Sequence, residues 1–159
     1  DEPGIPAFAA KAQSRNFSNV DTARIAWEGT GKAPSNQLTA EWSTQEWVRF
    51  IDGLGGTQPL DKLAELDRVF KFTGTPNGEI AMRWYPLAIR SGYAEATPAA
   101  AEFIERVGRR KLIMPIYAEL VKTPEGLEVA KAAFEKAKPG YHPITTGSVQ
   151  DMLSKADAR

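Results

Sequence analysis

Apolar residues recur along most of this chain at the three- and four-residue spacing of helices that bury one face. The clearest stripe is Trp47, Phe50, Ile51 and Leu54, at positions i, i+3, i+4 and i+7. Ser43 and Glu46 form a capping box just ahead of this stripe, which predicts where its helix begins. No segment shows the period-two alternation of a half-buried strand. The pattern therefore predicts an all-α protein.

Threonine with a nearby proline marks four predicted helix starts, at Thr57, Thr75, Thr97 and Thr123. Every second start lies 40 or 48 residues on (97 minus 57 and 123 minus 75), close to the roughly 40–47 residues of HEAT and armadillo repeats. The sequence thus predicts a two-layer helical superhelix of about eight helices, a HEAT/armadillo-like α-α repeat. An irregular helical bundle is the alternative.

Individual capping residues locate several of these helices more closely. Asn77 is expected to cap one helix, and Thr97-Pro98 and Thr123-Pro124 to place a capping hydroxyl before a proline in the first turn. The last predicted helix covers residues 143–153, and the tail KADAR is expected to fray.

The first residues carry Pro3, Gly4 and Pro6, followed by a run of small residues, AFAAKA. This composition predicts that residues 1–14 are an extended linker from an upstream domain and that residues 15–159 form the helical domain. Ser18, with Asp21 three residues on, is expected to cap a short first helix.

Composition and charge narrow the function classes. The chain has 159 residues, of which 42% are hydrophobic and 25% charged, as in an ordinary globular domain. Lys plus Arg and Asp plus Glu are 20 each, so the sequence offers no basic excess for nucleic acid or a membrane surface. It has no cysteine, no apolar run near the roughly 18 residues of a membrane span, and no signal-like start. A cytoplasmic location is expected.

A basic turn separates two apolar stretches within residues 103–120. Gly108 is expected to end the first helix in the left-handed conformation that favours glycine. Arg109, Arg110 and Lys111 then fall at the start of the next helix, where the dipole is positive and amide groups lack partners. Three cations there are locally unfavourable, which predicts that they bind an anion, either carboxylate or phosphate. A solvated basic turn is the alternative interpretation.

The residues do not provide a complete catalytic site. A zinc site takes three or four His, Cys or carboxylate ligands, and the chain has one histidine, His142, and no cysteine. We expect His142 to be structural. The carboxylate pairs Glu102/Glu105 and Glu125/Glu128 are expected to be solvated surface. The sequence therefore predicts no metal site and no hydrolysis by this chain alone.

Short motifs with a specific order and spacing carry a family resemblance. They are Pro3-Gly4-Ile5-Pro6, Glu79-Ile80 with Arg83-Trp84, Gly108-Arg109-x-Lys111, Pro115-Ile116-Tyr117 and His142-Pro143-Ile144-Thr145. With them the chain resembles the C-terminal domain of leukotriene A4 hydrolase and its bacterial aminopeptidase relatives, in the M1 family of zinc metallopeptidases. The resemblance covers nearly the whole chain.

The resemblance implies a two-layer helical domain that packs on a catalytic zinc domain of the same polypeptide, upstream of this chain. The H-E-x-x-H zinc site and the G-x-M-E-N peptide-binding motif belong to that domain, and neither occurs here. In the family, an Arg and a Lys of the C-terminal domain hold the substrate's carboxylate, and their positions match Arg109 and Lys111. Arg110, which stands where the best-known animal enzymes carry an apolar residue, is a third candidate.

The function implied is therefore hydrolysis of short peptides by an M1 zinc aminopeptidase, of which this chain is one part. The fragment itself needs no cofactor and is expected to be inactive without the zinc domain. An independent helical-repeat module that binds a partner protein through its concave face is the alternative.

Overall fold

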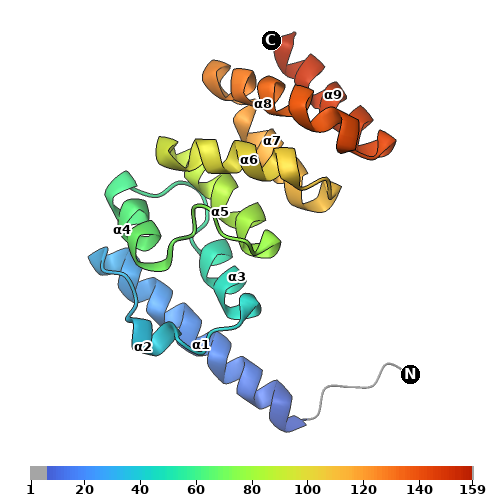
Figure 1. Cartoon of the computed structure of the whole chain (residues 1–159). Coiled ribbons are helices and arrows are strands. Elements are labelled where there is room, and N and C mark those ends of the chain that lie inside the picture. Colours follow the sequence, from blue (N-terminus) through green and yellow to red (C-terminus); the bar gives the residue numbers. More distant parts are fainter. Residues whose placement is uncertain (1–6, 159) are drawn as a thin grey trace. The chain divides into compact units, whose positions relative to one another are not determined.

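The structure, a computed structural model, describes the backbone of residues 7–158 and the side chains of residues 16–158. Every regular element in this part of the chain is a helix, so the all-α prediction is confirmed (Figure 1). The residues form two compact units, residues 1–55 and residues 56–159, which we describe separately.

The first unit contains α1 (Ala7–Thr30), α2 (Asn36–Thr39) and α3 (Thr44–Gly53). Trp27 of α1 is buried edge-on against Phe50 of α3, with ring centroids 6.3 Å apart. The predicted capping box is present, because the Ser43 amide donates to the Glu46 carboxylate at 3.2 Å while the Ser43 side chain accepts from the Glu46 amide. In this unit the long helix α1 therefore packs on the shorter α3 through an aromatic core.

The first helix differs from its prediction. Residues 7–14, predicted as extended linker, are the start of the 24-residue α1, and residues 1–6 lie outside the described part of the chain. Ser18 and Asp21 lie inside this helix, so they do not cap a short one. The physical reason is that no proline or glycine occurs between Pro6 and Gly29, while Ala, Lys, Gln and Arg favour the helix. The role of this segment as an interdomain linker stays a prediction.

The second unit contains six α-helices and two short 3₁₀ turns. They are α4 (Leu60–Phe70), α5 (Gly78–Ser91), η1 (Ala94–Ala96), α6 (Thr97–Arg106), α7 (Arg110–Leu120), α8 (Pro124–Ala137), η2 (Lys138–Gly140) and α9 (Pro143–Asp157). Alternate helices pack on one another: α5 on α7, α6 on α8, and α7 on α9. Two rows result, α5–α7–α9 and α6–α8, which is the two-layer arrangement expected of a helical repeat.

Of the three caps predicted in the second unit, at Asn77, Thr97 and Thr123, two hold and one does not. The Asn77 side-chain oxygen Oδ1 accepts from the amides of Glu79 and Ile80, at 3.0 and 3.3 Å, and the Thr123 hydroxyl accepts from the Gly126 amide at 3.0 Å. Thr97 is already the first residue of α6 and makes no capping bond, because the turn η1 leads directly into that helix.

The last helix is longer than predicted and continues to Asp157. The sequence predicted an end at Leu153. Asp157 is held by Lys131 of α8, whose ammonium donates to the carboxylate at 2.6 Å. This ion pair with a neighbouring helix favours the additional turn.

A polar cluster fixes the loop that leads into α5. The Asp67 carboxylate accepts from the Thr73 amide and hydroxyl, at 2.8 and 2.7 Å, and from the Tyr93 hydroxyl at 2.8 Å. The Trp84 indole donates to the Thr73 hydroxyl at 3.1 Å. Burial is the main cause that raises the pKa of Tyr93, with Asp67 adding to it, so the hydroxyl remains a donor. The cluster thereby ties the loop at Thr73 to Asp67 of α4 and Trp84 of α5.

Candidate functional site

The turn between α6 and α7 is extended rather than left-handed. Helix α6 ends at Arg106, and the backbone at Val107 (φ −102°, ψ 119°) and Arg109 (φ −74°, ψ 112°) is extended. Gly108 is not among the glycines with positive φ, so its predicted left-handed conformation is wrong. The helix ends because the chain straightens at Val107, a change that no residue type in this turn signals on its own.

Two buried tyrosines of the core, Tyr117 and Tyr141, support the turn between α6 and α7. The Tyr141 hydroxyl donates to the carbonyl of Ile104, near the end of α6. The Tyr117 hydroxyl of α7 bonds the Tyr141 hydroxyl at 3.0 Å, and burial raises the pKa of both tyrosines, which keeps them neutral. A Cβ at Gly108 would lie 3.6 Å from the Tyr141 ring, so the turn rests directly on it. The position of Arg109 is therefore set by the core.

The predicted start of the next helix is confirmed. Arg109 is the N-cap of α7, and Arg110 and Lys111 are its first two residues, with no acidic residue in the first turn. All three side chains are exposed. The cations thus lie at the positive end of the helix dipole, where the sequence placed them.

The structure separates the three cations by their partners. The Arg110 guanidinium donates to the hydroxyl of Ser148 on α9 at 3.1 Å, at the edge of a shallow groove of about 320 Å³ between α7 and α9. The Lys111 ammonium bonds Glu79 of α5 at 3.1 Å. The Arg109 guanidinium makes no hydrogen bond or ion pair with the described residues, although the Arg109 backbone carbonyl accepts from the amides of Leu112 and Ile113. Of the three, Arg109 is therefore the cation left available for a ligand.

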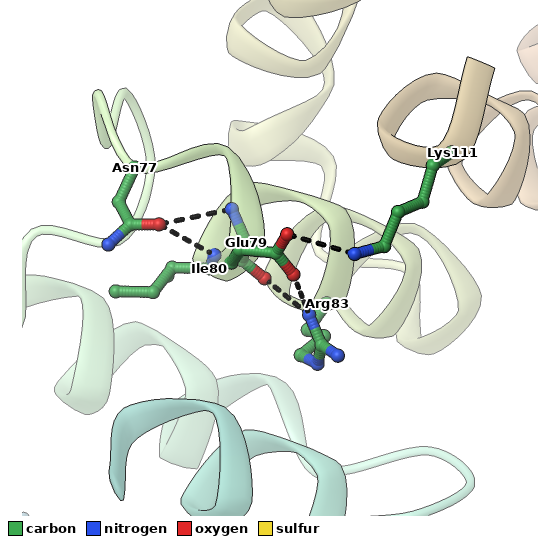
Figure 2. A network of polar contacts seen from close by, with 5 residues as sticks. All are labelled: Asn77, Glu79, Ile80, Arg83 and Lys111. Carbon is green, nitrogen blue, oxygen red and sulfur yellow. Dashed lines mark hydrogen bonds and ion pairs between the residues drawn. The ribbon is translucent and has the colours of Figure 1, made fainter. Parts of the chain in front are cut away.

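Glu79 lies between two cations at the first turn of α5 (Figure 2). One carboxylate oxygen accepts from Lys111, and the other accepts from Arg83 at 3.0 Å. The same nitrogen of Arg83 also donates to the Glu79 carbonyl at 2.9 Å, while the Asn77 cap fixes the Glu79 amide. The contact brings the N-terminal ends of α5 and α7 together.

Glu79 is missing from the candidate residues that the sequence provides. The sequence places it in the first turn of α5, one helical turn before Arg83, which is the ordinary position of a solvated helix pair. Its neighbour Lys111 is 32 residues away. Its place in one resemblance motif, Glu79-Ile80 with Arg83-Trp84, was the only signal that could have drawn attention to it.

We expect the Glu79 carboxyl to titrate below its ordinary pKa of 4.5, because Lys111 first, and Arg83 second, stabilise the charged form. Since the folded pKa is lowered, the stabilisation is present above the unfolded pKa and is lost as the pH falls through the folded value. Carboxyl-carbon NMR of the 159-residue chain measures this midpoint. Lys111→Met should move it upward, and an unchanged midpoint in that variant would contradict the ion pair.

The side chains present do not fit a metal site. Within residues 16–158, no group of three or more His, Cys, Asp or Glu residues could hold a metal ion. His142 is the N-cap of α9, where its Nδ1 accepts from the Ile144 amide at 3.1 Å. The structure thus gives the single histidine a structural role. Among the described helices, none has the length and apolar character needed to cross a membrane.

Comparison with known proteins identifies relatives among aminopeptidases and hydrolases. The chain is 27% identical over 135 residues to leucine aminopeptidase 2 of Neurospora crassa, a match covering 83% of this chain and 20% of that protein. It is 33% identical over 102 residues to leucine aminopeptidase 2 of Aspergillus niger, covering 64% and 16%. With leukotriene A-4 hydrolase of Xenopus laevis it shares 29% identity over 87 residues, covering 55% and 14%. The chain therefore spans a fifth or less of these relatives' length.

A structural comparison and a family profile agree with these sequence matches. Yeast LTA4 hydrolase superposes on 95% of this chain with a TM-score of 0.73, at 19% identity and over 28% of the yeast chain, which shows a common fold. The sequence profile described as leukotriene A4 hydrolase, C-terminal, matches residues 42–153, well over half of the chain. This chain belongs to the family of leukotriene A4 hydrolase C-terminal domains.

Proposed function

We propose that this chain is the C-terminal domain of an M1-type zinc aminopeptidase, where it packs on the catalytic domain and binds the C-terminal carboxylate of short peptides. The observation that carries the proposal is Arg109. Its guanidinium is exposed at the N-terminus of α7 and has no partner among the described residues, although the core fixes the turn beneath it. Two observations support the proposal that this chain is one part of a larger enzyme. It belongs to the family of C-terminal domains, and it matches only 20% of the length of an aminopeptidase.

The chemistry of the α7 N-terminus suits a carboxylate. A planar guanidinium can donate two parallel hydrogen bonds to one carboxylate, which fixes its orientation as well as its charge. The positive end of the helix dipole adds attraction for the same anion. Lys111, two residues on, supplies a second cation, which is a compact point charge rather than a planar group with paired donors. Arg109 is therefore the orienting contact and Lys111 the supplementary one.

Binding one end of a peptide gives this domain a role in catalysis without any catalytic group of its own. If the carboxylate is held at a fixed distance from the reacting bond, only peptides of matching length place their first bond correctly. The described side chains do not fit a zinc site, so in this proposal zinc is held by the catalytic domain. The residues of this chain bind and orient the substrate.

A pair of matched substrates tests the proposal directly. For the enzyme that carries this domain, we expect kcat/KM for a tripeptide with a free carboxylate to exceed that for its C-terminal amide by about ten- to a hundredfold. The amide keeps the length and side chains but removes the charge that Arg109 would bind. Equal kcat/KM values for the two peptides would refute the carboxylate role.

A further inference from the structure

We propose that Glu79 is a specificity-determining residue of this site, because its negative charge positions Lys111 and limits how strongly that cation attracts a substrate carboxylate. The inference rests on the proposed function and adds to it a residue from α5. It predicts that Arg109 and Lys111, two cations at one helix start, contribute unequally to carboxylate binding.

The geometry makes Glu79 an internal occupant of the anion site. Its carboxylate bonds the Lys111 ammonium at 3.1 Å, the kind of contact that a peptide carboxylate would make. Arg83 holds the other oxygen at 3.0 Å, and the Asn77 cap holds the backbone, so the carboxylate is fixed on α5 (Figure 2). Lys111 is thereby drawn toward α5.

The negative charge of Glu79 weakens the attraction of Lys111 for a substrate carboxylate. A substrate carboxylate that reaches Lys111 must approach the Glu79 carboxylate as well, and two like charges a few ångströms apart repel. The side chains of Lys111 and Glu79 are 56% and 36% exposed, so water screens this repulsion without removing it. Arg109 has no internal carboxylate partner in the described part of the chain. Most of the attraction for a free carboxylate therefore falls to Arg109, and Glu79 keeps the contribution of Lys111 small.

The test replaces Glu79 by its neutral isostere in the enzyme that carries this domain. Glu79→Gln keeps a side-chain oxygen that can accept from Lys111, but it removes the charge. We expect the ratio of kcat/KM for the free-acid tripeptide over its amide to rise by about three- to tenfold, with kcat/KM for the amide unchanged. Added salt should reduce the increase, because the effect is electrostatic.

Two further variants separate this role from a structural one. Glu125→Gln removes the same charge from the first turn of α8, at the opposite end of α7, and should leave the ratio unchanged. Lys111→Met in combination with Glu79→Gln should abolish most of the increase, because the two residues act as one unit. A merely structural loss would lower kcat/KM for both peptides equally.

The outcomes are distinguishable. A higher acid-to-amide ratio that depends on Lys111 supports the role of Glu79. A ratio that stays constant or falls in Glu79→Gln overturns it, while the proposed function stands if the wild-type enzyme still prefers the free acid. If the wild-type enzyme shows no such preference, the carboxylate site itself is refuted.

Discussion

Replacing Arg109 by alanine is expected to lower kcat/KM for free-acid tripeptides by about ten- to a hundredfold in the enzyme that carries this domain. The loss corresponds to about 1.5–3 kcal/mol, the usual contribution of a hydrogen bond to a charged group. The physical reason is that the Arg109 guanidinium has no partner among the described residues, so under the proposed function it would donate its hydrogen bonds to the ligand alone. Steady-state kinetics on the acid and amide forms of one tripeptide measure the effect.

Arg110→Ala is the matched control for this experiment, because it removes the same side chain at the next position. The structure directs Arg110 toward Ser148 on α9, whereas Lys111 extends toward α5. We therefore expect Arg110→Ala to change kcat/KM much less than Arg109→Ala does. An equal loss of kcat/KM in both variants would show that the basic turn acts only through its total charge. If Arg109→Ala left kcat/KM unchanged, the proposed carboxylate site would be refuted.

The second large effect concerns Gly126, in the first turn of α8. Alanine at this position should destabilise the folded chain by about 3 kcal/mol. A Cβ there would lie 2.1 Å from the carbonyl oxygen of Leu120 and 2.9 Å from the Thr123 hydroxyl. The first of these atoms is backbone, so the α7–α8 turn would have to move to relieve the overlap. Chemical denaturation followed by circular dichroism measures the change in unfolding free energy.

Gly147→Ala provides a control with the opposite expected sign. Gly147 lies inside α9, where a Cβ would meet no atom within 4 Å. Alanine should therefore stabilise the chain by about 0.5–1 kcal/mol, through its higher helix propensity. If both alanine variants changed stability in the same direction, steric contact at Gly126 would not be the cause.

The sequence predicted most of the helices because their signals are local. The capping box of Ser43 and Glu46, the Asn77 cap and the Thr123 cap each depend on residues three or fewer positions apart. The start of α7 followed from the same kind of local reasoning, and this placed Arg109, Arg110 and Lys111 at a helix N-terminus. The prediction failed at Gly108, which does not have a positive φ: its neighbours Val107 and Arg109 are extended, and Tyr141 of the core supports the turn.

The sequence by itself thus determined the helical class, the family resemblance and the basic turn in which an anion site was expected. Only the tertiary structure decided what each cation does. Lys111 pairs with a residue 32 positions away and Arg110 with one 38 positions away, so their partners depend on how α5, α7 and α9 pack. Three adjacent charges look alike in a sequence, because their neighbours across helices do not appear in it. Packing leaves Arg109 available and places Glu79 beside Lys111.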